Sequence, residues 1–219
     1  MNAAELTMAE DWLREAHPTA HIVREFSVSE YGGALVDVAA ILEDRIVGVE
    51  VKGEGDSPTR LPLQGMMYSR VCRSVFLLAA PSLRTRCAKH CPPGWGQLSI
   101  EPESAYGWKQ SGAIWCKRHH DQDKGYGLAP VALAAMPWTN EYGAFSAAIG
   151  WTVPKRKSDC IRAVAQHEPL PKIERAVCHV LRNRIWSKDV SLPADPPPAP
   201  AVEKTAYERA CEATGRLVP

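Results

Sequence analysis

The sequence predicts an α/β protein with a helical C-terminal part, and three observations support this. The composition, 45% hydrophobic and 23% charged over 219 residues, is typical of a folded globular chain. In the first hundred residues, helical periodicity alternates with short runs rich in valine and isoleucine. After about residue 140 the patterns are helical, and a proline-rich segment follows at 192–202.

The first elements follow from periodicity and from residues that break it. A helix is expected over 4–15, because apolar residues recur there at helical spacing before Pro18 stops it. Residues 21–28 alternate in polarity and predict a strand, and Gly33 marks the break that follows.

Residues 34–42 and 45–51 are rich in valine and isoleucine and predict a β-hairpin. Its turn is expected at Glu43-Asp44, which pairs Leu42 with Arg45, although these acids are not a favoured hairpin dipeptide.

The next segments alternate between helix and strand. Residues 61–72 lack an internal breaker other than one glycine and predict a helix, and the apolar run 74–80 predicts a buried strand. A short helix is expected over 83–90 before a Pro-Pro-Gly turn, with strands over 95–100 and 112–117.

The C-terminal third predicts helices at 141–149, 158–166 and 171–186, with a short one at 203–214. We therefore divide the chain into an α/β core (1–135), a basic helical extension (136–190) and a proline-rich linker with a tail (191–219).

Composition excludes several classes of protein. No apolar run approaches the ~20 residues of a membrane helix, and the acidic start MNAAELTMAEDWL is unlike a secretory signal. The seven cysteines are scattered and odd in number, so we expect reduced thiols, a cytoplasmic location and no membrane partner.

The net charge of +1 hides an uneven distribution. Residues 1–60 hold 12 acidic and 5 basic side chains, whereas residues 151–190 hold 4 acidic and 9 basic ones. This asymmetry suggests an acidic site facing a polyanion held elsewhere, although chance surface composition produces the same numbers.

Three ionisable residues are brought together by the predicted hairpin. Its register places Asp37 opposite Glu50, and Lys52 lies two residues further along the same face. The alternate residues are apolar and are expected on the other face: Val36, Val38, Ala40, Leu42, Val47, Val49 and Val51.

Two adjacent, half-buried carboxylates repel each other, and a hard divalent cation such as Mg²⁺ or Mn²⁺ offsets that repulsion. A lysine beside them adds positive charge where a phosphodiester develops negative charge during hydrolysis. The plainer interpretation is an internally neutralised cluster of Asp37, Glu50 and Lys52 at a sheet edge.

The order helix, three strands, helix, strand, together with Asp37 and Glu50-Val51-Lys52, resembles the PD-(D/E)XK nuclease superfamily, which has a restriction-endonuclease-like fold. Gln64 and Tyr68 resemble the Gln-x-x-x-Tyr element of RecB-like nucleases. Over roughly residues 20–100 the pattern is also similar to MmcB-type DNA-repair proteins and phage nucleases. The Pro-Asp dipeptide of the superfamily name is absent.

The resemblance implies an αβββαβ core with a mixed sheet and a metal-dependent deoxyribonuclease of DNA repair or phage DNA metabolism. It implies that Asp37, Glu50 and the Val51 carbonyl hold Mg²⁺ or Mn²⁺, and that Lys52 and Gln64 serve catalysis. An acid near the N-terminus is implied as a further metal ligand, with Glu10, Glu15 and Glu25 as candidates. Restriction-type enzymes often form homodimers.

Basic and aromatic residues are candidates for nucleic-acid binding. They are Arg60, Tyr68, Lys155, Arg156 and Lys157. The last three precede a helix–turn–helix-like pair that ends in Arg182-Asn-Arg184, although a helical pair that covers the sheet and has a solvated basic face is the favoured interpretation. Gln64 and Tyr68 also fit a purely structural role.

Two alternatives remain open. The first is a catalytically inactive DNA-binding or scaffolding protein on the same fold. The second is a zinc module built from Cys87, His90 and Cys91 with Cys116, His119 and His120. The first group has Cys-x3-Cys spacing rather than the stronger Cys-x2-Cys, so we expect ordinary thiols there rather than structural Zn²⁺.

Overall fold

The computed structural model describes residues 3–28, 34–100, 114–118, 121, 127–152 and 156–186, with the backbone alone for Ala3 and 114–118. Its strands are β1 His21–Ser27, β2 Leu35–Ile41, β3 Ile46–Lys52, β4 Ser74–Ala79, β5 Gly96–Ile100 and β6 Ile114–Arg118. Its helices are α1 Ala3–Ala16, η1 Pro58–Arg60, α2 Leu61–Tyr68, α3 Arg84–His90, α4 Pro130–Ala135, η3 Thr139–Glu141, α5 Tyr142–Ile149, α6 Lys157–His167 and α7 Leu170–Arg182.

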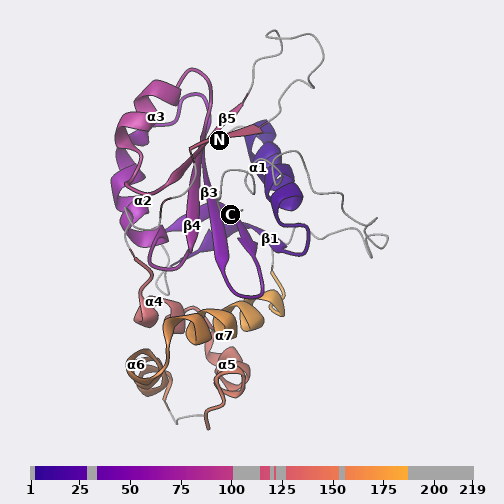
Figure 1. Ribbon diagram of the computed structural model, residues 1–219, viewed down its shortest axis with the longest axis vertical. Coiled ribbons are helices and arrows are strands. Elements are labelled where there is room, and N and C mark those ends of the chain that lie inside the picture. Colours follow the sequence, from indigo (N-terminus) through magenta and orange to yellow (C-terminus); the bar gives the residue numbers. More distant parts are fainter. Residues whose placement is uncertain are drawn as a thin grey trace, which may run out of the picture. The chain divides into compact units, whose positions relative to one another are not determined.

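The described strands form one six-stranded sheet in sequential order, which confirms the α/β class (Figure 1). Strands β1, β2 and β3 are antiparallel neighbours, β3, β4 and β5 are parallel, and β6 returns antiparallel to β5. Helices α2 and α3 make the connections that parallel strands require. Among the described residues, no helix has the length and apolar composition needed to cross a bilayer.

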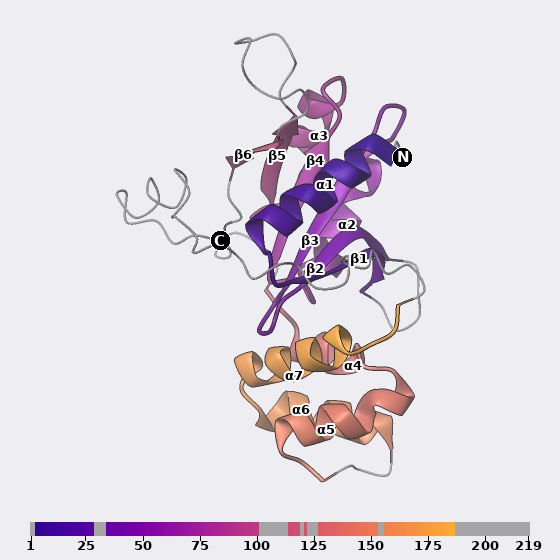
Figure 2. The same ribbon diagram turned by 90° about the vertical axis from the view of Figure 1, so that its right-hand side faces the viewer.

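The sheet is covered on both faces. Helix α1 crosses one face, where Ala9 and Leu13 pack on Val38 and Phe76 (Figure 2). Helices α2 and α3 lie on the opposite face (Figure 1). All seven residues of β3 are buried, so any charged side chain on this strand must find a partner inside the protein.

The register of the β2–β3 hairpin is the predicted one. Val38 pairs with Val49, Ile41 pairs with Ile46, and the Leu42 amide donates to the Arg45 carbonyl at 2.9 Å across the turn. The hydrophobic alternation of both strands therefore determined the register, despite an unfavoured turn dipeptide.

The alternation breaks where β2 reaches Asp37. Paired residues of β1 and β2 flank Glu25 and Asp37 but omit them, and Glu25 has a left-handed backbone with φ of 50°. Val36 consequently packs on the α2 face, where a Cβ on Gly48 would lie 3.0 Å from Val36 Cγ1. The prediction that Val36 shares a face with Val38 is therefore wrong, because strict alternation was assumed through the break.

Two helical predictions also differ from the structure. The helix expected to reach residue 72 ends at Tyr68, where the amides of Arg70 and Val71 donate to the carbonyls three residues back, of Met67 and Tyr68, at 3.3 and 3.0 Å. Helix α4 was not predicted, since six residues beginning at Pro130 offer too little periodicity. The helix expected at 203–214 lies outside the described residues.

Helices α4 to α7 join the same core cluster as the α2 face of the sheet. Helix α5 ends at Gly150 with φ of 79°, the left-handed conformation that glycine adopts without strain. At the start of β4, Arg73 donates through Nε at 3.2 Å and through Nη2 to the carboxylate of Glu174 on α7. These helices belong to the compact unit Met1–Asp189.

Gly65 is the point where α2 packs most closely on the turn before β5. A Cβ at this position would lie 2.3 Å from Pro92 Cγ, and a proline ring cannot move aside. Gly65→Ala is expected to lower the free energy of unfolding by about 1–3 kcal/mol through overpacking, measured by urea denaturation.

Gly143 on α5 provides the matched control for this substitution. Nothing lies within 4 Å of a Cβ there, so Gly143→Ala is expected to raise stability by about 0.5–1 kcal/mol. Equal effects of the two substitutions would contradict the close approach of α2 to Pro92.

Candidate functional site

Glu50 and Lys52 lie at the end of β3, on the face that α2 covers. Their exposed fractions are 1% and 4%, and Lys52 Nζ donates to Glu50 Oε1. Alternating side chains of a strand share a face, so the Glu-x-Lys spacing alone brings these two groups together. Because water has almost no access to this pair, the charges of Glu50 and Lys52 must be compensated by groups of the protein itself.

Asp37 completes the predicted trio. Its Oδ2 accepts a hydrogen bond from the Val51 amide at 2.7 Å. This contact lies just beyond the last paired residues of the hairpin, Val38 and Val49. Burial and, to a lesser extent, the charge of Glu50 raise the pKa of Asp37, whereas the Val51 amide and Lys52 lower it, and the net result is a pKa of about 7. The two carboxylates therefore interact, as the predicted register requires.

The backbone of Val51 is directed toward this acid pair. The carbonyls of Ile46 and Lys52 accept from Arg73 and Ala80 at 2.8 Å each, on the β4 side of β3. Backbone groups alternate along a strand between its two neighbours. Those of Val51 consequently point toward β2 and Asp37, which is the side on which the predicted carbonyl ligand belongs.

Side chains of helix α2, which covers this face of the sheet, form hydrogen bonds to the site. Gln64 Nε2 donates to Glu50 Oε1 at 2.6 Å and to the Tyr68 hydroxyl at 2.9 Å, and that hydroxyl donates to the Leu35 carbonyl. Gln64 and Tyr68 lie one helical turn apart, as their i, i+4 spacing predicts. This chain of hydrogen bonds ties the start of β2 to the end of β3.

Tyr68 lies within the core and not at a binding surface. Its side chain is 0% exposed, and its ring stacks on Trp95 with centroids 5.8 Å apart. Burial raises the pKa of the Tyr68 hydroxyl, so the group stays a neutral hydrogen-bond donor. In this conformation Tyr68 holds Gln64 and does not reach a nucleic acid, unlike the contact expected from sequence.

The remaining nucleic-acid candidates are dispersed. Arg60 is exposed at the start of α2, and Arg156 is exposed before α6. Lys157 lies with its Nζ 5.2 Å from the centre of the Tyr142 ring, and Lys155 lies outside the described residues. The described candidates therefore lie on two different helical segments, Arg60 directly before α2 and the other two at the start of α6.

Arg184 is unavailable to a phosphate. It is 8% exposed, donates to Glu141 through Nε at 2.8 Å and through Nη2 at 2.5 Å, and lies between the rings of Trp138 and Trp186. Of the two arginines expected to bind phosphate at the end of the helical pair, only Arg182 is thus available.

The candidate acids near the N-terminus have different surroundings. Glu10 is buried and forms an ion pair with Arg24, whereas Glu15 and Glu25 are exposed. A further buried acid, Glu5, was missed, although its helical spacing to Ala9 and Leu13 would have placed it on the inner face of α1.

Asp56 is the other acid that sequence reasoning missed. Its Oδ2 accepts from the Gly53 amide at 2.9 Å, and its charge contributes to the raised pKa of Asp37. The signal was present in the segment Gly53 to Asp56, because aspartate commonly closes such a turn on its own backbone. Asp56 thus adds negative charge near the acid pair.

The donor set fits a hard divalent cation with open coordination positions. Glu50 Oε2 and Gln64 Oε1 are buried oxygen atoms without a hydrogen-bond partner, and ionised Asp37 is disfavoured by its surroundings. Among the described side chains, no group of three His, Cys, Asp or Glu can hold a metal ion. Two carboxylates with a backbone carbonyl suit Mg²⁺, which retains waters as its other ligands.

The zinc interpretation gains no support from the described cysteines. Cys87 is buried, and burial raises its thiol pKa, which disfavours the thiolate that zinc requires. Cys116 is described by its backbone only, and His119 and His120 lie outside the described residues.

Tyr68→Phe separates a positioning role from a nucleic-acid contact. Under the nuclease function expected from the sequence, loss of the hydroxyl frees Gln64 and should slow phosphodiester cleavage about tenfold without changing DNA affinity. The control is Tyr142→Phe, since the Tyr142 hydroxyl donates to the Ala134 carbonyl at 2.6 Å within the helical part. A weakened affinity with an unchanged cleavage rate would contradict the positioning role.

No protein-family model matches this sequence, and comparisons with curated proteins and with solved structures found no match either.

Proposed function

We propose that this protein is a Mg²⁺- or Mn²⁺-dependent deoxyribonuclease with a PD-(D/E)XK-like site. The observation that supports it most strongly is the convergence of Asp37, Glu50 and Lys52 at the end of β3, with Gln64 bonded to Glu50 at 2.6 Å. Three ionisable groups at the buried end of two largely apolar strands are costly to stability, and such cost is common at functional sites.

The order of elements supports a restriction-endonuclease-like core. Helix α1, the antiparallel strands β1 to β3, helix α2 and the parallel strand β4 follow one another as the αβββαβ pattern requires. This order of elements is the structural support for the proposed core. The role in DNA repair or phage DNA metabolism rests on that resemblance.

Each residue has a distinct part in the proposed chemistry. Asp37 and Glu50, with the Val51 carbonyl, would hold the divalent cation, which supplies a Lewis acid that stabilises charge developing on the phosphate. Lys52 places a fixed ammonium beside that charge, where water is excluded and the interaction is stronger. Gln64 orients the Glu50 carboxylate through Oε1 and leaves Oε2 for the cation.

A plasmid-nicking assay tests the proposal. Purified protein with Mn²⁺ is expected to convert supercoiled DNA into nicked or linear forms, and EDTA is expected to stop the reaction. A single-stranded and a double-stranded oligonucleotide, each as DNA and as RNA, define the substrate. Absence of cleavage with Mg²⁺ and with Mn²⁺ on all of them would refute the nuclease proposal.

A second candidate is a DNA-binding or scaffolding protein without catalysis. It is favoured by the direct bond between Lys52 and Glu50, because a carboxylate already neutralised by lysine has less need of a cation. That protein would bind DNA with a salt-dependent affinity and would not cut it under the same conditions.

A further inference from the structure

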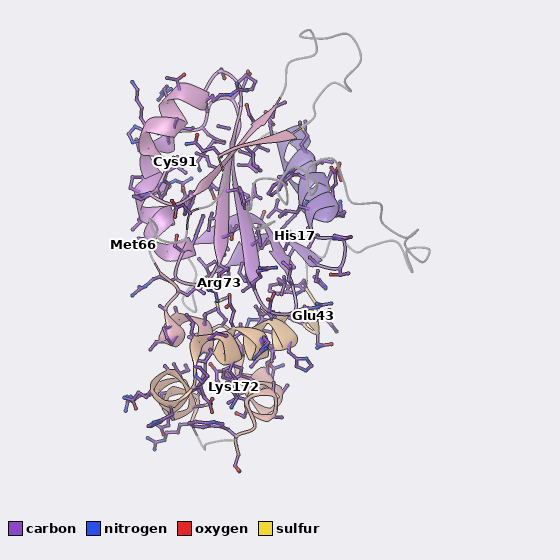
Figure 3. All side chains as sticks on the ribbon, in the orientation of Figure 1. His17, Glu43, Met66, Arg73, Cys91 and Lys172 are labelled. Atoms are coloured by element: carbon purple, nitrogen blue, oxygen red, sulfur yellow. The ribbon has the colours of Figure 1, made fainter. Side chains whose placement is uncertain are left out.

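A polar cleft lies at the end of the sheet opposite the acid pair. It has a volume of about 240 Å³ and is lined by Asp44, Arg45, Arg73, Pro171, Glu174 and Arg175. Figure 3 shows Arg73 where the strands approach α7. The volume suits a single phosphate group with a few waters and is smaller than typical pockets for drug-sized ligands, about 300–1,000 Å³.

The charges that line the cleft leave an excess of positive charge. Arg73 is engaged by Glu174, whose carboxylate takes both of its hydrogen bonds. Arg45 Nε is 3.5 Å from Asp44 Oδ1, yet it is a buried nitrogen without a hydrogen-bond acceptor. No acidic partner of Arg175 is found among the described residues. The guanidinium of Arg175 and the Nε–H group of Arg45 are therefore the donors that remain for an anion.

The solvent-facing side of α7 extends this positive charge. Basic residues recur there at spacings of three and four, which places them on one helical face: Lys172, Arg175, His179 and Arg182. Lys172 and Arg182 have acids nearby, with Nζ to Glu168 Oε2 at 2.8 Å and Nη1 to Glu43 Oε1 at 3.8 Å. Arg175 is thus the most available cation on this face.

We propose that the cleft between the β2–β3 turn and α7 is a phosphate-binding site, and that its occupant is a backbone phosphate of the nucleic-acid substrate. Arg175 and Arg45 contact the phosphate, since guanidinium groups donate in a fork that matches its oxygens. Arg73 stays with Glu174 and holds the wall of the cleft. This inference rests on the proposed nuclease function for the identity of the occupant.

The cleft would bind the substrate away from the bond that is cut. Arg45 precedes Glu50 by five residues, which is about 17 Å along an extended strand. The basic face of α7 spans about 15 Å between Lys172 and Arg182, equal to the axial rise of about four nucleotides in one strand of a duplex. A phosphate held at this distance positions the nucleic acid and takes no part in the chemistry.

The test compares Arg175→Ala with Arg162→Ala, which removes the same charge from an exposed site on α6. Binding of a labelled DNA duplex is measured by fluorescence anisotropy over a range of salt, with Ca²⁺ in place of Mg²⁺ to limit cleavage. Thermal unfolding with inorganic phosphate measures the free anion. Arg45→Ala provides a second variant in the same cleft.

We expect Arg175→Ala and Arg45→Ala to weaken DNA binding about tenfold and to lower the slope of log K against log salt by about 1, with KM raised and kcat unchanged. The stabilisation by inorganic phosphate is expected to be lost in both variants and retained in Arg162→Ala. If that stabilisation is lost while DNA affinity stays at the wild-type level, the occupant is a free anion and the nucleic-acid assignment is overturned.

Variants that behave like wild type with both ligands overturn the site itself. The two proposals fail separately. If Arg175→Ala cuts DNA at the wild-type rate with an unchanged KM, the proposed phosphate site is refuted and the nuclease proposal stands. If DNA affinity depends on Arg175 and Arg45 but no divalent cation supports cleavage, the nuclease proposal is refuted and the phosphate site stands.

Discussion

Replacing Lys52 with methionine is expected to reduce phosphodiester cleavage at least about 100-fold, because the substitution removes the fixed positive charge beside the reacting phosphate. Methionine preserves most of the side-chain volume in this buried position. The measurement is the initial rate of plasmid nicking with Mn²⁺. Lys89→Met, at an exposed position on α3, is the matched control and is expected to cut at the wild-type rate.

The same substitution is expected to lower the free energy of unfolding by about 3–5 kcal/mol, since the buried Glu50 carboxylate would lose its ammonium partner. The double variant Glu50→Gln/Lys52→Met removes both charges and is expected to recover most of that stability while remaining inactive. Stability and activity are thereby separated. A stable double variant that cuts DNA at the wild-type rate would contradict the proposed mechanism.

Replacing Asp37 with asparagine is expected to stabilise the protein in EDTA at pH 8 while abolishing cleavage. Asparagine keeps an oxygen for the Val51 amide, which donates to Asp37 Oδ2 at 2.7 Å, and removes the repulsion from Glu50. We expect the Tm to rise by at least about 2 °C, the shift that about 1 kcal/mol produces in a chain of this size.

The pH dependence of that gain follows from the pKa of Asp37, which is raised from 3.8 to about 7 in the folded protein. The folded state therefore binds the proton more tightly than the unfolded state does. The favourable contribution is complete below about pH 4 and is lost as the pH rises through 7. The advantage of Asp37→Asn should grow over this range.

Thermal unfolding of wild type and Asp37→Asn in EDTA from pH 4 to pH 9 measures this difference. Mn²⁺ at pH 8 is expected to raise the Tm of wild type and to have little effect on the variant, because the cation binds the ionised carboxylate. Parallel curves for the two proteins across the pH range would show that Asp37 titrates normally.

The elements that the sequence predicted well are those with strong local patterns. The hairpin register followed from the alternation of valine and isoleucine although the turn dipeptide was unfavourable, and just beyond its last paired residues Asp37 interacts with the charge of Glu50. The i, i+4 spacing of Gln64 and Tyr68 likewise held in α2. Both patterns act over a few residues, where spacing alone determines which side chains meet.

Features that depend on tertiary packing were not predictable in the same way. At the break in alternation, the Asp37 side chain accepts the hydrogen bond of the Val51 amide, a contact that the alternating pattern does not reveal. The core position of Tyr68 depends on Trp95, which arrives from the turn before β5. The cleft at Arg45 and Arg175 lies between segments about 130 residues apart in the sequence, and short-range sequence patterns do not predict contacts over that separation.

Anomalous diffraction from a crystal grown with Mn²⁺ tests the central claim most directly. The account predicts one manganese peak within about 2.5 Å of carboxylate oxygens from both Asp37 and Glu50, and its loss in Asp37→Asn. Manganese bound elsewhere, with no peak between these two residues at saturating Mn²⁺, would contradict the claim that they form a metal site.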